Sequence, residues 1–345
     1  MFKLRLVQGL IAGACTILSM GATAGLVTTG IFTGNVGVSI DGIGSNSTPV
    51  GDVQASIPIG STILQAYLYS AGTPFPWYAD SPTTLASYNG AGITLAGNAI
   101  TNFDTLVGAT ALPSRPDIGD WFTARADVTS LVQSLIIGAV TDSFSWSVSE
   151  GTLNNRIDGE VLVIVYSNPA LALNSVALLD GGQNTGGETT IVNLGAPLTD
   201  PNAAGFVAIM SIADSFSCCG NQRSTIKVNG SLVTDNAGNF DDGLVLPPAD
   251  GSLITVGGIG DTPANNQSYA NDHELYDLRP FLATGDTSFS FFTQNPSNDD
   301  NIFFMALQLT GDITDVSPAP EPATLALLGL GLGMLGVSRR RQHSR

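Results

Sequence analysis

The stretch Val161-Leu162-Val163-Ile164-Val165-Tyr166 decides the fold class, because an unbroken run of β-branched, apolar and aromatic residues favours a buried strand. Shortly before it, residues 143–148 alternate serine with Phe144, Trp146 and Val148, as a strand with one buried face does. The chain contains 40 Gly and 18 Pro, which interrupt it at short intervals, and residues 128–140 form the clearest candidate for a helix. The sequence therefore predicts an all-β protein built from β-sandwiches.

The two halves of the chain share an ordered set of sequence landmarks. They are residues 66–71, 88–90, 102–104, 127–131, 143–146 and 161–166 in the first half, and residues 208–213, 228–230, 239–241, 277–281, 288–291 and 302–307 in the second. A set of this size in the same order indicates an internal duplication. We expect two tandem jelly-roll-like sandwiches, at residues 25–167 and 168–316, with the boundary at Asn168-Pro169 because proline stops a strand.

Each half also carries local signals for turns and caps. Asn89-Gly90 and Asn229-Gly230 are predicted to turn hairpins, since both residue types tolerate a left-handed backbone. Asp127 and Asp277 are predicted to accept a backbone N–H at the start of a short helical turn. The Ser-Phe-Ser segments at 143–145 and 288–290 are predicted to send aromatic rings inward and hydroxyls outward.

The composition excludes several classes of function. Residues 25–316 keep six basic and 28 acidic residues, a difference of −22, and this charge repels nucleic acids and anionic membranes. Cations and neutral polymers are the partners that fit this charge. His273 is the single histidine outside the C-terminal tail, and the cysteines are Cys15 and the adjacent pair Cys218 and Cys219. These residues cannot build a three-histidine or four-thiolate zinc site, nor a framework of several disulfides.

The N-terminus has the layout of a secretory signal peptide over residues 1–24. Lys3 and Arg5 precede an apolar run, and the small residues Ala22 and Ala24 occupy the positions that a signal peptidase requires. We expect cleavage after Ala24. A retained membrane anchor and a lipoprotein modified at Cys15 are the alternatives.

The C-terminus combines three features in a fixed order. Pro320-Glu321-Pro322 is followed by an uncharged, glycine-rich apolar run at residues 323–337 and then by Arg339-Arg340-Arg341. As a helix, the apolar run would span roughly 22 Å, which is short of the ~30 Å hydrocarbon core. The arginines would hold the end of the tail on the cytoplasmic side. The hydrophobic helix 323–337 is therefore predicted to be a marginal and transient membrane anchor.

This C-terminal tail, residues 317–345, resembles the PEP-CTERM sorting signal of Gram-negative bacteria. The resemblance rests on Pro320, Glu321 and Pro322, on the apolar helix, and on Arg339, Arg340 and Arg341. It implies recognition by an exosortase, an integral-membrane cysteine protease thought to process such tails. It also implies export and association with exopolysaccharide and biofilm matrix. An ordinary single-pass anchor is the alternative.

Part of the chain before the tail is also similar to other proteins. Residues 66–71, Ala-Tyr-Leu-Tyr-Ser-Ala, look like a segment of an uncharacterised family of secreted β-domain proteins that often carry such a tail. This similarity implies a secreted β fold and no particular activity.

Three segments rich in Asp and Asn suggest calcium, at residues 235–243, 271–277 and 295–301. Calcium binds six to eight oxygen ligands, and loops of this composition supply them, although none matches the EF-hand loop. The candidate ligands are Asp241, Asp242, Asp299 and Asp300. The alternative is that these residues simply form turns between strands. Calcium is the one cofactor that the sequence suggests.

Three further groups of residues have a chemical and a structural interpretation. His273 lies between two acidic residues and would suit a general base, but no Gly-x-Ser-x-Gly elbow stands in a strand-turn-helix context, so a hydrogen-bonded loop histidine is favoured. Cys218 and Cys219 would form a vicinal disulfide after export, with a redox role as the alternative. The aromatic residues that would stack on sugars or pack in a core are Trp77, Tyr78 and Trp121.

Together these features predict a non-catalytic, exported protein of the cell surface or extracellular polysaccharide matrix. Its expected partners are exosortase, the secretion machinery and exopolysaccharide, with transient membrane contact through the C-terminal helix and no nucleic acid. A carbohydrate-binding module is the first alternative, and a secreted glycan-active hydrolase is the second. An enzyme would need two carboxylates, or His273 and a carboxylate, in reach of a common cleft.

Overall fold

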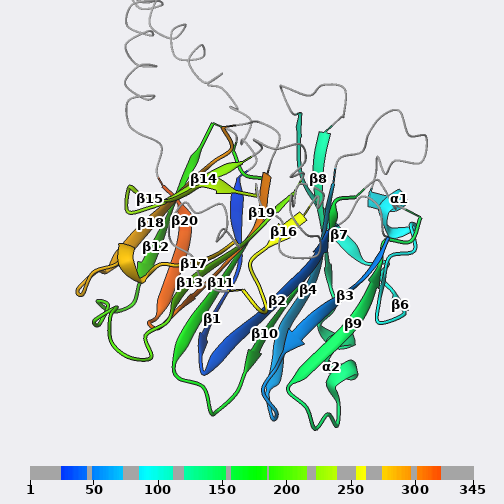
Figure 1. Cartoon of the computed structure of the whole chain (residues 1–345), viewed down its shortest axis with the longest axis horizontal. Coiled ribbons are helices and arrows are strands. Elements are labelled where there is room, and N and C mark those ends of the chain that lie inside the picture. Colours follow the sequence, from blue (N-terminus) through cyan, green and yellow to red (C-terminus); the bar gives the residue numbers. More distant parts are fainter. Residues whose placement is uncertain are drawn as a thin grey trace, which may run out of the picture.

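The computed structural model describes residues 25–44, 49–72, 85–111, 120–152, 157–184, 186–215, 223–238, 254–261, 274–296 and 301–319. Nearly all regular structure in these ranges is β, and every strand pairing is antiparallel. The strands form four sheets (Figure 1). The prediction of an all-β protein is therefore confirmed.

The first half supplies two of the four sheets, which we call the first inner and first outer sheet. The first inner sheet has the order β2 (Val36–Gly44), β10 (Gly159–Ser167), β4 (Thr62–Gly72), β8 (Asp120–Asp127) and β7 (Phe103–Ala111). The first outer sheet has the order β3 (Val50–Ser56), β9 (Ser143–Ser149), β5 (Thr94–Leu95) and β6 (Asn98–Ala99). Two short helices accompany them, α1 (Leu85–Asn89) and α2 (Thr129–Ile136).

The second half supplies most of the other two sheets. The second inner sheet has the order β1 (Leu26–Gly34), β11 (Asn174–Gly181), β19 (Asn301–Leu309), β13 (Ala208–Ser215) and β16 (Ile254–Val256), with β17 (Leu275–Asp277) also paired to β13. The second outer sheet has the order β15 (Ser231–Ala237), β14 (Ser224–Val228), β18 (Ser288–Gln294), β12 (Glu188–Leu194) and β20 (Ile313–Pro318). A single 3-10 turn, η1 (Arg279–Phe281), follows β17.

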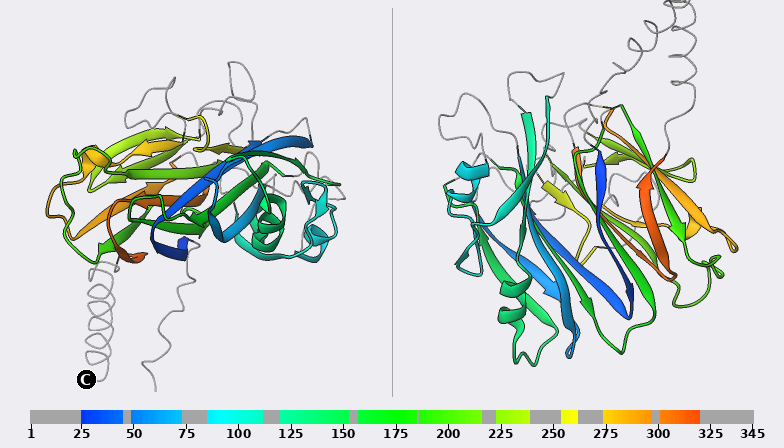
Figure 2. Two further views of the ribbon diagram at one scale, coloured as in Figure 1. Left: turned by 90° about the horizontal axis from the view of Figure 1, so that it is seen from below. Right: turned by 180° about the vertical axis from the view of Figure 1, so that it is seen from behind.

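Three hydrophobic cores hold the four sheets in one stack. One core lies between the first outer and first inner sheets, and another between the second inner and second outer sheets. The third core lies between the two inner sheets, where Val163 of β10 and Leu178 of β11 are fully buried. The two halves therefore pack face to face as four layers, which two views at right angles make visible (Figure 2).

The position of β10 explains its uninterrupted apolar sequence. Leu162 and Ile164 point into the core of the first sandwich, and Val161, Val163 and Val165 point into the core between the two inner sheets. A strand buried on both faces needs apolar residues at every position. The residues of β9 instead alternate, with Trp146 and Val148 buried and the serines turned outward, as predicted.

The first strand crosses the predicted division at Asn168. β1 pairs with β11 along its length, from Leu26 opposite Gly181 to Gly34 opposite Asn174. Leu26 is buried in the core of the second sandwich. The boundaries 25–167 and 168–316 stay a prediction, and the topology adds that β1 belongs to a sheet formed largely by the second half.

The same strand order occurs in both halves. In the inner sheets, β2-β10-β4-β8 has the order of β11-β19-β13-β17, and in the outer sheets, β3-β9-β5-β6 has the order of β12-β18-β14-β15. The inner strands also agree in detail, because Val128 N donates to Ala66 O at 2.9 Å and Leu278 N donates to Ala208 O at 2.8 Å. These contacts make Ala66 and Ala208 equivalent positions.

Asp127 and Asp277 accept backbone N–H bonds as predicted, but each lies one residue before the N-cap, which is Val128 in α2 and Leu278 in η1. The carboxylate of Asp127 accepts the backbone N–H of Thr129 at 2.9 Å, and that of Asp277 accepts the N–H of Arg279 at 3.0 Å.

The predicted helix at 128–140 is present as α2, but it ends at Ile136. Gly138 follows with a φ of +72°, a left-handed conformation that stops a helix.

One predicted hairpin is confirmed and the other is wrong. Asn229-Gly230, with φ of +50° and +78°, joins β14 to β15, with Val228 opposite Ser231. Asn89 is instead the last residue of α1, where its side chain donates to Phe103 O at 2.9 Å and accepts from Phe103 N at 2.7 Å. The hairpin in this half uses Ala96-Gly97, with φ of +50° and +74°.

Candidate functional site

Most residues that the sequence suggested as sites lie outside the described ranges. This applies to the signal cleavage residues, the sorting motif, the calcium candidates, the cysteine pair, the histidine and two aromatic residues: Ala22, Ala24, Pro320, Glu321, Pro322, Arg339, Arg340, Arg341, Asp241, Asp242, Asp299, Asp300, Cys218, Cys219, His273, Trp77 and Tyr78. The helix 323–337 lies outside them too, and Trp121 belongs to β8. The structure tests none of these assignments.

The described ends of the Asp- and Asn-rich segments are engaged with neighbouring groups. Asp235 lies 3.9 Å from the guanidinium of Arg223, and Asp277 lies 2.5 Å from that of Arg279. Where the structure describes the chain, no group of three or more Asp, Glu, His or Cys side chains has the spacing of a metal site. The calcium prediction at Asp241, Asp242, Asp299 and Asp300 is neither supported nor contradicted by these contacts.

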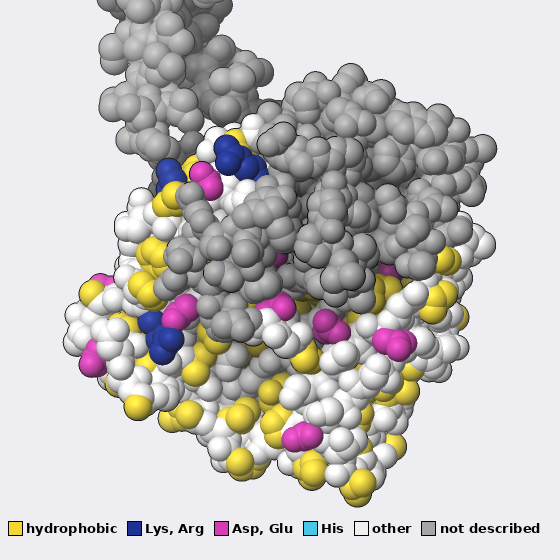
Figure 3. All heavy atoms as spheres, in the orientation of Figure 1, with side chains coloured by type: hydrophobic (Ala, Val, Ile, Leu, Met, Phe, Trp, Pro, Cys, Tyr) yellow, Lys and Arg dark blue, Asp and Glu magenta, His cyan; other side chains and the backbone are white. Residues whose placement is uncertain are grey.

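Charged side chains are sparse on the face shown in Figure 3. Carboxylates appear there at separate positions, and basic side chains are few. The lysines and arginines of the described ranges are Arg125, Arg223, Lys227 and Arg279. This visible face therefore has no continuous basic patch among the described residues that would bind a phosphate backbone.

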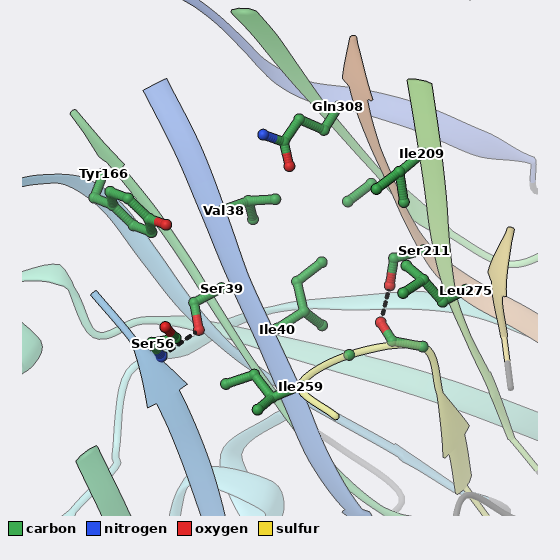
Figure 4. A pocket seen from close by; sticks show the side chains of 13 residues that line it. Val38, Ser39, Ile40, Ser56, Tyr166, Ile209, Ser211, Ile259, Leu275 and Gln308 are labelled. Carbon is green, nitrogen blue, oxygen red and sulfur yellow. Dashed lines mark hydrogen bonds between the residues drawn. The ribbon is translucent and has the colours of Figure 1, made fainter. Parts of the chain in front are cut away.

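A cavity of about 250 Å³ lies where the two halves meet (Figure 4). It is lined by β2, β3, β10, β13, β17 and β19, and by the segment 257–259. This segment joins β2 through a 3.1 Å bond from Ile259 N to Ile40 O. Gly258 is required there, because a side chain would overlap the carbonyl oxygen of Ile40. The cavity thus exists because a second-half loop crosses the edge of a first-half strand.

The polar groups of this cavity are neutral. Ser56 N donates to the Ser39 hydroxyl at 3.0 Å, and the Ser211 hydroxyl donates to the carbonyl of Gly257. Tyr166 adds a phenol whose pKa is raised by burial, so it stays protonated, and Gln308 adds a carboxamide. None of the described lining residues is charged. These groups suit a small neutral polar ligand better than an ion.

Another group of residues, which the sequence interpretation missed, lies inside the first sandwich. Glu150 follows β9, Glu160 lies on β10, and Asp158 precedes β10. Each of these side chains is at most 1 % exposed. The alternation of strand residues places them there: Glu150 continues the inward series of Trp146 and Val148, and Glu160 continues that of Leu162 and Ile164.

The environment of this group strongly favours the uncharged carboxyl form when no cation is present. Burial raises the pKa of Glu150, and the nearby Glu160 and Asp158 carboxylates raise it further. Burial also raises the pKa of Asp158 and Glu160, and the Ser70 hydroxyl, 3.4 Å from Glu160 Oε1, opposes the shift of Glu160 only in part. We call Glu150, Asp158 and Glu160 the buried acid cluster.

The second half has neutral residues at the corresponding positions. Asn295 follows β18 as Glu150 follows β9. Because Ala66 is equivalent to Ala208, Ser70 corresponds to Ile212. Ser70 pairs with Glu160, and Ile212 pairs with Met305, so Met305 corresponds to Glu160. The sequence does contain a signal for the cluster, because Glu150 and Glu160 each stand at the end of a strand, in the alternating series of residues that face the core.

No helix within the described ranges is both long and apolar enough to cross a lipid bilayer. This finding concerns only those ranges, and the predicted helix 323–337 is not among them.

Comparison with known proteins identifies the C-terminal tail. A model of the PEP-CTERM protein-sorting motif matches residues 318–342, which include Pro320, Glu321, Pro322 and the three arginines. A search of curated proteins and a search of solved structures gave no match. The motif implies export, sorting toward the cell envelope and processing by exosortase. The chain therefore carries the C-terminal signal of an exported, exosortase-sorted PEP-CTERM protein.

Proposed function

We propose that this protein is a non-catalytic component of the cell surface or extracellular polysaccharide matrix, delivered there through its C-terminal motif. The observation that carries the proposal is the match of the sorting motif to residues 318–342. The motif begins at the last residue of β20, and Ala319 N still donates to Thr189 O of β12 at 2.8 Å. The sorting signal therefore starts where the body ends, with no spacer between them.

The distribution of acidic groups supports a non-catalytic role. The buried acid cluster lies inside a sandwich core, and the described residues around the cavity between the halves are neutral. A glycan hydrolase of the common type needs two carboxylates facing a substrate cleft.

We propose that transient anchoring through helix 323–337 precedes release of the body.

The repeated strand order supports an internal duplication. We infer that an ancestral sandwich was copied, that the copies pack through their inner sheets, and that β1 extends the second inner sheet across the joint. The equivalent backbone bonds at Ala66 and Ala208 support the same inference.

Carbohydrate binding is the second candidate, because the cavity between the halves presents neutral hydroxyls beside an aromatic ring. Isothermal titration with neutral mono- and disaccharides would detect such binding. Binding should weaken at least tenfold in a Gln308→Ala variant and remain in a variant of an exposed residue far from the cavity, such as Leu232→Ala.

Fractionation of the producing cells tests the matrix role. The protein should be recovered with the extracellular polysaccharide and should leave that fraction when glycan-degrading enzymes dissolve it. Recovery of the processed protein only as free protein in the culture medium would contradict the proposal.

A further inference from the structure

We propose that Glu150 and Glu160 hold a divalent cation of the calcium class inside the first sandwich. This site is separate from the loop residues Asp241, Asp242, Asp299 and Asp300, and it does not depend on the matrix role. The two glutamates come from facing sheets, so a bound cation would tie the outer sheet to the inner sheet at the end of their shared core.

Buried carboxylate oxygens of the acid cluster support this site. Glu150 Oε2, Asp158 Oδ2 and Glu160 Oε2 are buried, and among the described residues they have no hydrogen-bond partner. An ionised carboxylate in such a place is costly unless a positive charge or several donors compensate it. Among the contacts of the described residues, these side chains have one hydrogen bond, from Ser70 to Glu160.

The fold does not require acidic residues at these two positions. The corresponding positions of the second half hold Asn295 and Met305, in a strand arrangement of the same order. Met305 is fully buried among the apolar residues of the second sandwich. The charges of Glu150 and Glu160 therefore serve something other than strand pairing.

The atoms available to hold a cation at this place are oxygens. Glu150 and Glu160 offer carboxylate oxygens, the Ser70 hydroxyl lies 3.4 Å from Glu160 Oε1, and the Gly159 carbonyl lies 3.3 Å from that hydroxyl. Oxygen ligands of this kind select calcium or magnesium over zinc or copper. In the described ranges, no three Asp, Glu, His or Cys side chains are spaced as metal ligands. A site of two carboxylates completed by neutral oxygens is consistent with this finding. Asp158 lies close enough to raise the pKa of Glu150, and in its ionised form it would attract the cation further.

Cation binding to the purified full chain tests the site. After removal of metal with a chelator, calcium and magnesium would be added at neutral pH, and binding would be followed by equilibrium dialysis and by thermal unfolding. We expect a dissociation constant of about 10⁻⁴ to 10⁻³ M, as in extracellular calcium modules. We expect saturating cation to raise the Tm by about 5 °C.

Three variants and one control make the test specific. Glu150→Gln and Glu160→Gln remove one charge each, and Glu160→Met copies the second half. All three should fold without cation, with a Tm at least equal to that of the cation-free wild type, and should lose one bound cation and most of the Tm rise. Asp52→Asn, at an exposed position of β3, should keep both.

Two results would overturn the proposal. The first is a wild-type chain whose Tm and dialysis show no cation binding. Glutamine variants that are then more stable than the wild type only at alkaline pH would show that the glutamates share protons instead. The second is unchanged binding in both glutamine variants, with loss instead in Asp241→Asn or Asp299→Asn.

Discussion

The Tyr69 hydroxyl donates a 2.9 Å hydrogen bond to Oδ2 of Asp180, and this bond crosses from β4 of the first inner sheet to β11 of the second. The same oxygen accepts Nη1 of Arg125 at 2.5 Å. The guanidinium of Arg125 also lies 4.8 Å from the ring centre of Tyr67. Burial raises the pKa of Tyr69, and the Asp180 carboxylate raises it further, so the hydroxyl remains a donor. A polar contact thus joins the two halves beside the apolar central core.

Asp180→Ala should destabilise the protein by about 3 kcal/mol, because it leaves the Tyr69 hydroxyl and the Arg125 guanidinium without their shared acceptor. This value is at the low end for a buried pair, since the Arg125 side chain is 19 % exposed. Urea unfolding would measure the loss. The exposed Asp52→Ala should change stability by less than about 0.5 kcal/mol. A loss below about 1 kcal/mol for Asp180→Ala would show that the contact does not join the halves.

Leu178→Ala should cost about 3 kcal/mol, because Leu178 is fully buried between the inner sheets. Unfolding should remain one cooperative transition, since the central core and β1 join the halves. Leu173→Ala, in the turn before β11 and 69 % exposed, is the matched control and should have little effect. Two separate transitions in the wild type, one of them unmoved by Leu178→Ala, would contradict the four-layer description.

Asp41 should make stability depend on pH between about 4 and 6. Burial raises its pKa to about 6, the neighbouring Asp261 raises it slightly, and the N–H of Gln54, at 2.5 Å, opposes the shift. Between pH 4 and 6 the folded state holds this proton more tightly than the unfolded state. The contribution of Asp41 to stability therefore falls as the pH rises through that window, by about 1–2 kcal/mol after allowance for partial exposure.

Asp41→Asn removes this titration, so the stability of the wild type relative to the variant should decrease from pH 4 to pH 6. Urea unfolding at several pH values would measure the difference. A difference that stays constant with pH, or that grows in favour of the wild type, would show that Asp41 ionises normally.

The sequence predicted the strands well because their signals are local. The apolar run of β10 and the alternation in β9 gave the right elements, and Asp127 and Asp277 accept the backbone N–H bonds predicted for them. The Asn89-Gly90 prediction failed because the same dipeptide can end a helix, and its asparagine bonds to a strand instead.

The packing of the halves could not be predicted from these local signals. An uninterrupted apolar strand such as β10 shows that both of its faces are buried, but not which distant sheet covers the second face. The pairing of β1 with β11 also joins segments far apart in the sequence. The buried acid cluster needed two registers to be combined, that of Trp146 with Glu150 and that of Glu160 with Leu162.

Mass spectrometry of the protein recovered from outside its producing cell tests the central claim most directly. An exosortase-sorted protein should have lost a C-terminal segment that includes Arg339, Arg340 and Arg341, and deletion of residues 320–345 should stop its delivery to the surface while leaving the body folded. Extracellular protein with an intact C-terminus ending at Arg345, or unchanged delivery of the deletion variant, would contradict the account.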